Sequence, residues 1–241
     1  MSFWPTLTAS ILAAVVTTVG IYVMNKFAKW GKKNVIYFMS FAAGVLISVS
    51  FMHIIPKSFE MNSMAPVFLL AGFFFLHLFN RFLKGFVCGE KAGKNYVFGI
   101  IPALGIGFHS FIDGVIYSVT FSVSIFTGIL AAIGMVLHEF PEGIVTFLLL
   151  AKSGFKKNKS SLYAFLAAAI TTPLGVLVSW PFISMLTSQV LGILLSLSAG
   201  ALVYVGATHL LPKVEEESKK YALLALAAGI VVAVIIIISG A

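Results

Sequence analysis

The 241-residue chain has 60% hydrophobic residues and only 10% charged residues, and its mean hydropathy is +1.06. Soluble domains carry roughly 25% charged residues, so this composition excludes a soluble domain and indicates an integral membrane protein. A single cysteine, Cys88, excludes an internal disulfide. The formal net charge of +8 would suit nucleic-acid binding, but the positions of the basic residues favour another explanation.

Apolar runs long enough to cross a bilayer, about 20 residues each, recur along the whole chain. They predict an all-α membrane protein with a single transmembrane domain, residues 1–241, and no separate soluble part. The eight predicted spans cover approximately residues 5–25, 34–56, 64–83, 97–121, 126–151, 160–183, 189–211 and 221–239.

The basic residues are concentrated in every second loop between these predicted spans. Fifteen of the 16 lysines and arginines fall in the first, third, fifth and seventh loops, and only Lys57 lies in an opposite loop. Loops rich in lysine and arginine stay in the cytoplasm. We therefore expect a plasma-membrane protein with both termini outside the cytoplasm, and we attribute its charge to topology rather than to nucleic-acid binding.

An internal repeat relates the second and seventh predicted spans. Ala43-Gly44-Val45-Leu46 leads to His53-Ile54-Ile55-Pro56-Lys57, and Ala199-Gly200-Ala201-Leu202 leads to His209-Leu210-Leu211-Pro212-Lys213, at a constant offset of 156 residues. Because these two spans run in opposite directions, the repeat is inverted, with helices 1–3 and 6–8 placed around helices 4 and 5. Inverted repeats with a midplane site are typical of transporters.

Two copies of one motif lie in the fourth and fifth spans. They read His109-Ser110-Phe111-Ile112-Asp113-Gly114 and His138-Glu139-Phe140-Pro141-Glu142-Gly143. Residues i and i+4 share a helix face, so each histidine lies over a carboxylate. Two such helices side by side would direct two imidazoles and two carboxylates to one point.

This set of side chains suits a borderline divalent cation such as zinc, iron(II), manganese, cobalt or cadmium. Asp113, Glu139 and Glu142 lie inside predicted spans, where an ionised carboxylate needs a partner, and no lysine or arginine lies well inside any span. The alternative role is hydrogen bonding between membrane helices, which the doubled motif disfavours. The metal would be a transported substrate, and no prosthetic group is expected.

Other polar residues in the spans leave more than one role open. Glu139 could serve an adjoining metal subsite or be a protonated structural acid. His53 and His209, each three residues before a proline, could be relay ligands along a transport pathway or hydrogen-bonded histidines at a kink. For His77 we favour packing, and for Cys88 a bystander role.

In these motifs the sequence resembles the ZIP (Zrt/Irt-like) family of divalent-metal transporters, over nearly the whole chain. The resemblance implies metal uptake toward the cytoplasm through a main site of His109, Asp113, His138 and Glu142, with Ser110 and Glu139 bordering a second site. Two departures concern that second site. Ser110 stands where the family often has asparagine, and Thr172, rather than a glutamate, precedes Pro173.

The expected partners are metal ions, the lipid bilayer and a second copy of the chain in a homodimer. The competing functional class is an intramembrane zinc metalloprotease, whose hallmark is His-Glu-x-x-His. Here Glu142 replaces the second histidine of that signature and Pro141 interrupts the turn. We therefore expect a transporter and not an enzyme.

Overall fold

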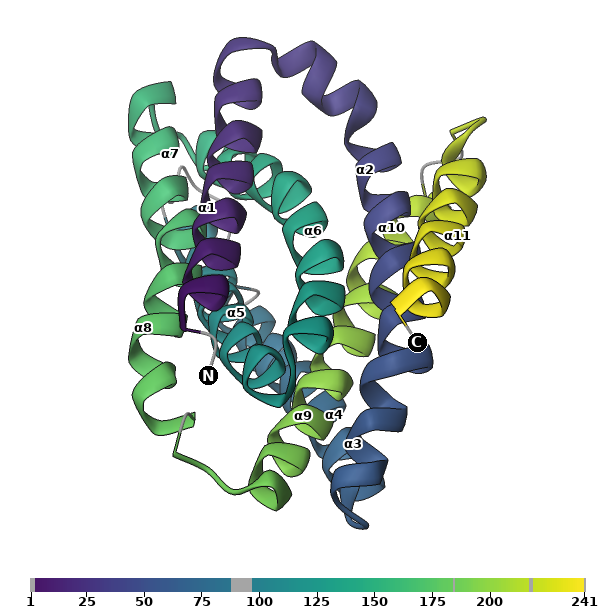
Figure 1. The fold of residues 1–241 in the computed structure, drawn as a ribbon. Coiled ribbons are helices and arrows are strands. Elements are labelled where there is room, and N and C mark those ends of the chain that lie inside the picture. Colours follow the sequence, from purple (N-terminus) through teal and green to yellow (C-terminus); the bar gives the residue numbers. More distant parts are fainter. Residues whose placement is uncertain (1–2, 88–96, 184, 217–218, 241) are drawn as a thin grey trace.

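A computed structural model describes residues 3–87, 97–183, 185–216 and 219–240, and these residues form a bundle of long helices without strands (Figure 1). The helices are α1 (Phe3–Lys26), α2 (Ala28–Val49), η1 (Ser50–Ile54), α3 (Ile55–Met61), α4 (Ala65–Val87), α5 (Val97–Val123), α6 (Ile125–Lys152), α7 (Lys157–Ala164), η2 (Phe165–Ala169), α8 (Thr171–Ile183), α9 (Ser188–Tyr204), η3 (Val205–Leu210), α10 (Leu211–Glu216) and α11 (Ala222–Gly240).

Seven continuous helices in the described part of the chain, some made of several labelled segments, are long and apolar enough to cross a membrane. Three of them are composite, because α2, α7 and α9 each continue through a π-helical segment into α3, α8 and α10. An eighth apolar stretch, Ala65–Phe79 within α4, is shorter. The prediction of an all-α, multi-pass membrane protein is therefore confirmed.

A proline follows each π-helical segment within four residues. Pro56 follows η1, Pro173 follows η2 and Pro212 follows η3. A proline has no N–H to give to the carbonyl four residues earlier, and its ring crowds that carbonyl. A wider π turn relieves this crowding while the helix continues. In α6, by contrast, the helix runs through Pro141 without such a turn.

The two central helices, α5 and α6, pack against each other, and each has a further neighbour. α6 lies along α1, and α5 lies along α8. The glycine that ends each motif permits these contacts. A Cβ on Gly114 would collide with the backbone of Thr172, and a Cβ on Gly143 would collide with the backbone of Thr17. These glycines therefore hold both motifs at close helix–helix contacts in the interior.

The remaining long helices form a second set of close pairs. α2 packs along α11, which is visible on one side of the bundle in Figure 1, and α9 packs along α4. α2 also contacts α6, and α9 contacts α5, so the two sets meet around the central pair. Fully buried apolar side chains such as Leu46, Leu130 and Leu195 fill the space between them.

Candidate metal site

The doubled motif brings four side chains to one point between α5 and α6. One ligand atom each from His109, Asp113, His138 and Glu142 lies within 4.8 Å of the other three. α5 supplies the first two residues and α6 supplies the last two. Because each pair is spaced i,i+4 on its helix, the two faces meet as the sequence predicted.

Histidine nitrogens and carboxylate oxygens are the atoms that face one another. The Nε2 atom of His138 is 3.2 Å from Asp113 Oδ2 and 3.9 Å from Glu142 Oε2. The Nε2 atom of His109 is 3.5 Å from the same aspartate oxygen and 3.6 Å from the same glutamate oxygen. A four-coordinate zinc ion, with ligand distances of about 2.0–2.2 Å, holds neighbouring ligand atoms about 3.3–3.6 Å apart. The spacing therefore fits such an ion.

Hydrogen bonding does not account for this arrangement. Asp113 Oδ2 and His138 Nε2 are both buried, and neither has a hydrogen-bond partner within the described part of the chain, although they are near each other. Buried polar groups are normally hydrogen-bonded. The ligand atoms of a bound cation each direct a lone pair to a shared centre. They therefore lie close together without being aligned for hydrogen bonds to one another.

Exposure falls from one end of the cluster to the other. The side chains of His109 and Glu142 are 20% and 10% exposed, whereas those of Asp113 and His138 are 2% and 3% exposed. α5 begins and α6 ends at the lysine-rich loops, so the more exposed pair is the one nearer those loops. The more exposed part of the cluster is therefore nearer the lysine-rich end, and its buried part, which we call the closed side, faces the opposite end.

Ser110 borders the cluster through a direct contact with one of its carboxylates. Its hydroxyl donates to Glu142 Oε1 at 2.5 Å, which leaves Oε2 facing the two histidines. Ser110 is fully buried, so this hydrogen bond is shielded from water and fixes the glutamate rotamer. The structure thus places Ser110 beside the four-residue cluster.

Glu139 lies outside the cluster and has partners that the sequence did not reveal. Its carboxylate accepts hydrogen bonds from Thr17 of α1 and from Thr172 of α8, the latter at 3.2 Å. All three side chains are fully buried. We call Thr17, Glu139 and Thr172 the threonine clamp. It joins α1, α6 and α8 and occupies both oxygens of the carboxylate.

A signal for Thr17 exists in the sequence but is weak. Thr6, Ser10, Ala13, Thr17 and Gly20 are small or polar residues at helical spacing in the first span, and the structure buries all five. Such stripes mark helix-packing faces in membranes. They do not reveal which acid the face meets, because that depends on how far α1 is rotated and shifted against α6.

His53 and His77 do not join the cluster. His53 in η1 lies 3.1 Å from the hydroxyl of Thr127, through its Nε2 atom, and its ring meets the ring of Phe126 edge-on. Thr127 precedes His138 by 11 residues, or about 16 Å along a helix. His77 makes edge contacts with Phe74 and Tyr204, which agrees with the predicted packing role.

Two predicted residues cannot be placed in the same way. The side chain of His209 lies outside the described residues, although its backbone is part of η3. Cys88 also lies outside the described part of the chain.

The chain is similar in sequence to known zinc transporters. Residues 88–237 match the sequence profile of the ZIP zinc transporter family. The chain is 31% identical to a zinc transporter ZupT of Chlorobium luteolum over an alignment 258 positions long, which covers 96% of both chains. It is 32% identical to a zinc transporter ZupT of Nitratidesulfovibrio vulgaris over an alignment 214 positions long, which covers 74% of this chain and 76% of that one. The chain belongs to the ZIP zinc transporter family.

Proposed function

We propose that the protein carries divalent metal cations, zinc first among them, across the plasma membrane toward the cytoplasm. The observation that carries this proposal is the convergence of His109, Asp113, His138 and Glu142 between two membrane helices. The relatives named above are zinc transporters by name. Family members are transporters rather than enzymes, so the metalloprotease alternative is discarded.

Charge explains why a cation is the substrate. Two ionised carboxylates in a membrane interior are costly unless neutralised. In the described part of the chain, the ionisable partners of Asp113 and Glu142 are the two histidines. Neutral imidazoles are the metal-binding form, and a divalent cation would then balance the two carboxylates.

The donor set also defines the class of metals. Two imidazoles and two carboxylates suit zinc, iron(II), manganese, cobalt and cadmium, and affinity order alone does not select one of them. The tetrahedral spacing favours zinc. The metal is the transported substrate and not a resident cofactor.

We propose one main site rather than two equal sites. The threonine clamp uses both oxygens of Glu139, and Ser110 donates to Glu142. A second ion bound by Ser110 and Glu139 would have to displace these contacts. We therefore assign Ser110 to orienting Glu142, and Glu139 to joining helices.

An inverted repeat of helices 1–3 and 6–8 is part of the proposal, and matched backbone contacts support it. Gly44 of α2 approaches the backbone of Leu226 in α11, whereas Gly200 of α9 approaches the backbone of Leu69 in α4. Gly44 and Gly200 are separated by the repeat offset of 156 residues. The π-helical segments η1 and η3 overlap at the same offset.

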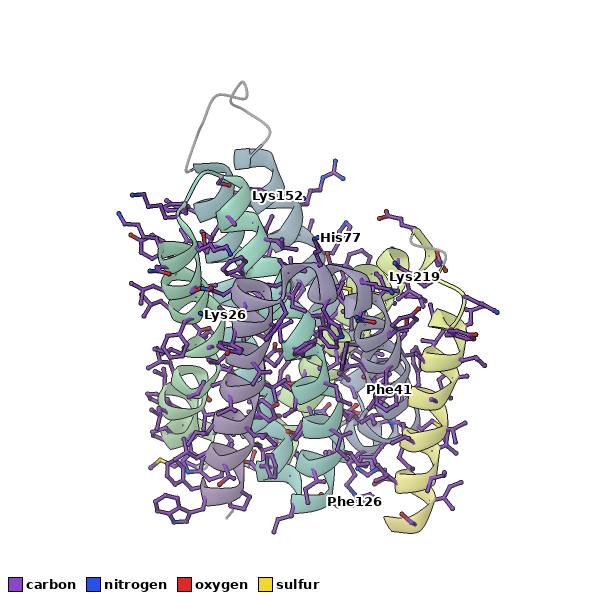
Figure 2. The ribbon with its side chains drawn as sticks, turned by 90° about the horizontal axis from the view of Figure 1, so that it is seen from above. Lys26, Phe41, His77, Phe126, Lys152 and Lys219 are labelled. Atoms are coloured by element: carbon purple, nitrogen blue, oxygen red, sulfur yellow. The ribbon has the colours of Figure 1, made fainter. Side chains whose placement is uncertain are left out.

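We also retain eight spans, counting α4 as the third, with both termini outside the cytoplasm. The basic residues support this orientation, since Lys26, Lys152 and Lys219 lie toward one end of the bundle and Phe126 lies at the opposite end (Figure 2). A single transmembrane domain and a homodimer remain predictions. His53 and His209 are proposed as relay residues near opposite ends of the pathway, because the offset of the repeat relates them.

Uptake into proteoliposomes tests the function. The purified full chain should take up zinc, and a panel of divalent ions tested with and without a pH gradient should define its range. Asp113→Asn and Glu142→Gln keep side-chain volume but remove charge, so each should lose most uptake. Glu60→Gln, an exposed acid paired with Lys57, is the matched control and should transport normally. Normal uptake by both site variants would refute the proposal.

A further inference from the structure

Tyr117 lies one helical turn beyond Asp113 on α5, on the side away from the lysine-rich end. It follows Asp113 by four residues and His109 by eight, so all three lie on one face of α5. It is farther from the lysine-rich end than Asp113 by about 6 Å along the helix. Its side chain is 0% exposed, which continues the decrease in exposure along the cluster.

The tyrosine ring is embedded in apolar surroundings. It belongs to the main hydrophobic core, together with Leu46 of α2 and Met135 of α6. Leu46 is near Gly134, one turn before His138 on α6. This core closes the end of the cluster opposite the lysine-rich loops. Phenylalanine would fill such a position equally well, so the hydroxyl group requires a separate explanation.

That hydroxyl has no hydrogen-bond partner within the described part of the chain. A buried tyrosine O–H usually has one, and an unpaired hydroxyl carries a desolvation penalty. Long side chains on a helix lean toward its N-terminus, which for Tyr117 is the direction of Asp113.

We propose that the Tyr117 hydroxyl is a fifth cation-contacting group of the site, a neutral oxygen ligand on its closed side. This inference rests on the proposed function, since it adds a ligand to the same site. Tyr117 supplies the oxygen that a water molecule would otherwise provide, in a core that excludes water. A fifth ligand also bears on metal choice, because zinc is satisfied by four ligands whereas manganese favours higher coordination by oxygen.

α6, which carries the second copy of the motif, has no unpaired hydroxyl at the equivalent position among the described residues. The residue four positions after Glu142 is Thr146, and its hydroxyl donates to the backbone carbonyl of Glu142 at 2.8 Å. It is therefore engaged in its own helix. The two motifs are alike from histidine to glycine, but only the α5 motif continues with an unpaired buried hydroxyl among the described residues. The fifth oxygen is thus specific to the closed side.

Cobalt(II) bound to the purified full chain tests this assignment, because its visible absorption is stronger in four-coordinate than in five-coordinate sites. Tyr117→Phe removes only the hydroxyl. It should raise the cobalt absorption per bound ion and weaken zinc binding about tenfold, the typical effect of losing one contact to a charged group, with a larger loss for manganese. Without metal, it should melt at or above the wild-type temperature because an unpaired polar group is gone.

Ser122→Ala is the matched control. Ser122 carries the other unpaired buried hydroxyl of α5 among the described residues, but it lies nine residues from Asp113, about 180° around the helix. It should leave the cobalt spectrum and metal affinity unchanged. Unaltered spectra and affinities in Tyr117→Phe, or equal changes in Ser122→Ala, would overturn the assignment.

A parallel titration of Asp113→Asn separates this inference from the proposed function. If the wild type binds cobalt, Asp113→Asn does not, and Tyr117→Phe behaves as wild type, only the role of Tyr117 is refuted. If Asp113→Asn binds cobalt as the wild type does, the four-residue site itself is refuted, and the fifth ligand with it.

Discussion

The threonine clamp makes a specific prediction about stability. Thr17→Val replaces a hydroxyl by a methyl group of similar size and removes one of the two hydrogen bonds to Glu139. Thr17 and Glu139 are both fully buried, so water cannot replace the lost bond. The remaining bond from Thr172 is the longer of the two, at 3.2 Å. We therefore expect Thr17→Val to cost more stability than Thr172→Val.

The magnitude follows from the type of bond. Hydrogen bonds between membrane helices contribute on average about 0.6 kcal/mol. The largest measured values reach about 1.7 kcal/mol, and the Thr17 bond is the shorter of the two bonds to Glu139. Loss of the Thr17 bond should then cost about 1–2 kcal/mol. For a chain of this size, 1 kcal/mol corresponds to about 2–4 °C in melting temperature, so Thr17→Val should melt about 2–8 °C lower than the wild type.

Thermal unfolding in detergent, followed by circular dichroism, measures this shift. Thr18→Val is the matched control, because Thr17 and Thr18 both lie within hydrogen-bond distance of the carbonyl oxygen four residues earlier, but only Thr17 also reaches across to Glu139 of α6. Thr18→Val should melt within about 1 °C of the wild type. Equal melting of the two valine variants would show that the clamp does not stabilise the bundle, and the structural role of Glu139 would be wrong.

Other predictions concern the pathway, packing, topology and protons. His53→Ala should slow zinc uptake while leaving zinc affinity within about twofold of the wild type; a protein lost from the membrane would favour a packing role instead. Gly114→Ala should fail to accumulate or should melt well below the wild type, because its Cβ meets the α8 backbone; wild-type melting would contradict the close contact. Cysteines introduced at Ser2 and Ser239, after replacement of Cys88, should react with an impermeant reagent from outside, and labelling only after permeabilisation would refute the orientation. Zinc should raise the melting temperature less at acid pH, because protons compete for the imidazoles and carboxylates, and a pH-independent shift would exclude these ligands.

Hydropathy predicted the helices well where apolar residues define both ends. The run predicted at 97–121 corresponds to α5, Val97–Val123, and that at 126–151 corresponds to α6, Ile125–Lys152. The second span was predicted too short, at 34–56, whereas helix begins at Ala28 and continues to Met61. Lysines at its start lower hydropathy but are good helix formers, and η1 lets the helix continue past Pro56.

The candidate site could be predicted because its geometry lies within two helices. An i,i+4 pair shares a helix face whatever the rest of the fold does. The two pairs therefore meet if α5 and α6 pack against each other through these faces. The partners of Glu139 were not predictable in this way, since Thr17 and Thr172 belong to distant spans whose rotations are set by packing. Tyr117 could not be singled out from the sequence either, because the sequence does not reveal that its hydroxyl lacks a partner.

Metal-dependent melting tests the central claim most directly. Zinc should raise the melting temperature of the wild-type protein in proportion to the logarithm of its concentration above Kd, since a ligand that binds only the folded state stabilises it. Alanine at His109 or His138, asparagine at Asp113 and glutamine at Glu142 should each reduce that rise sharply. If all four variants keep the full wild-type shift, zinc binds elsewhere and the site between α5 and α6 is not the metal site.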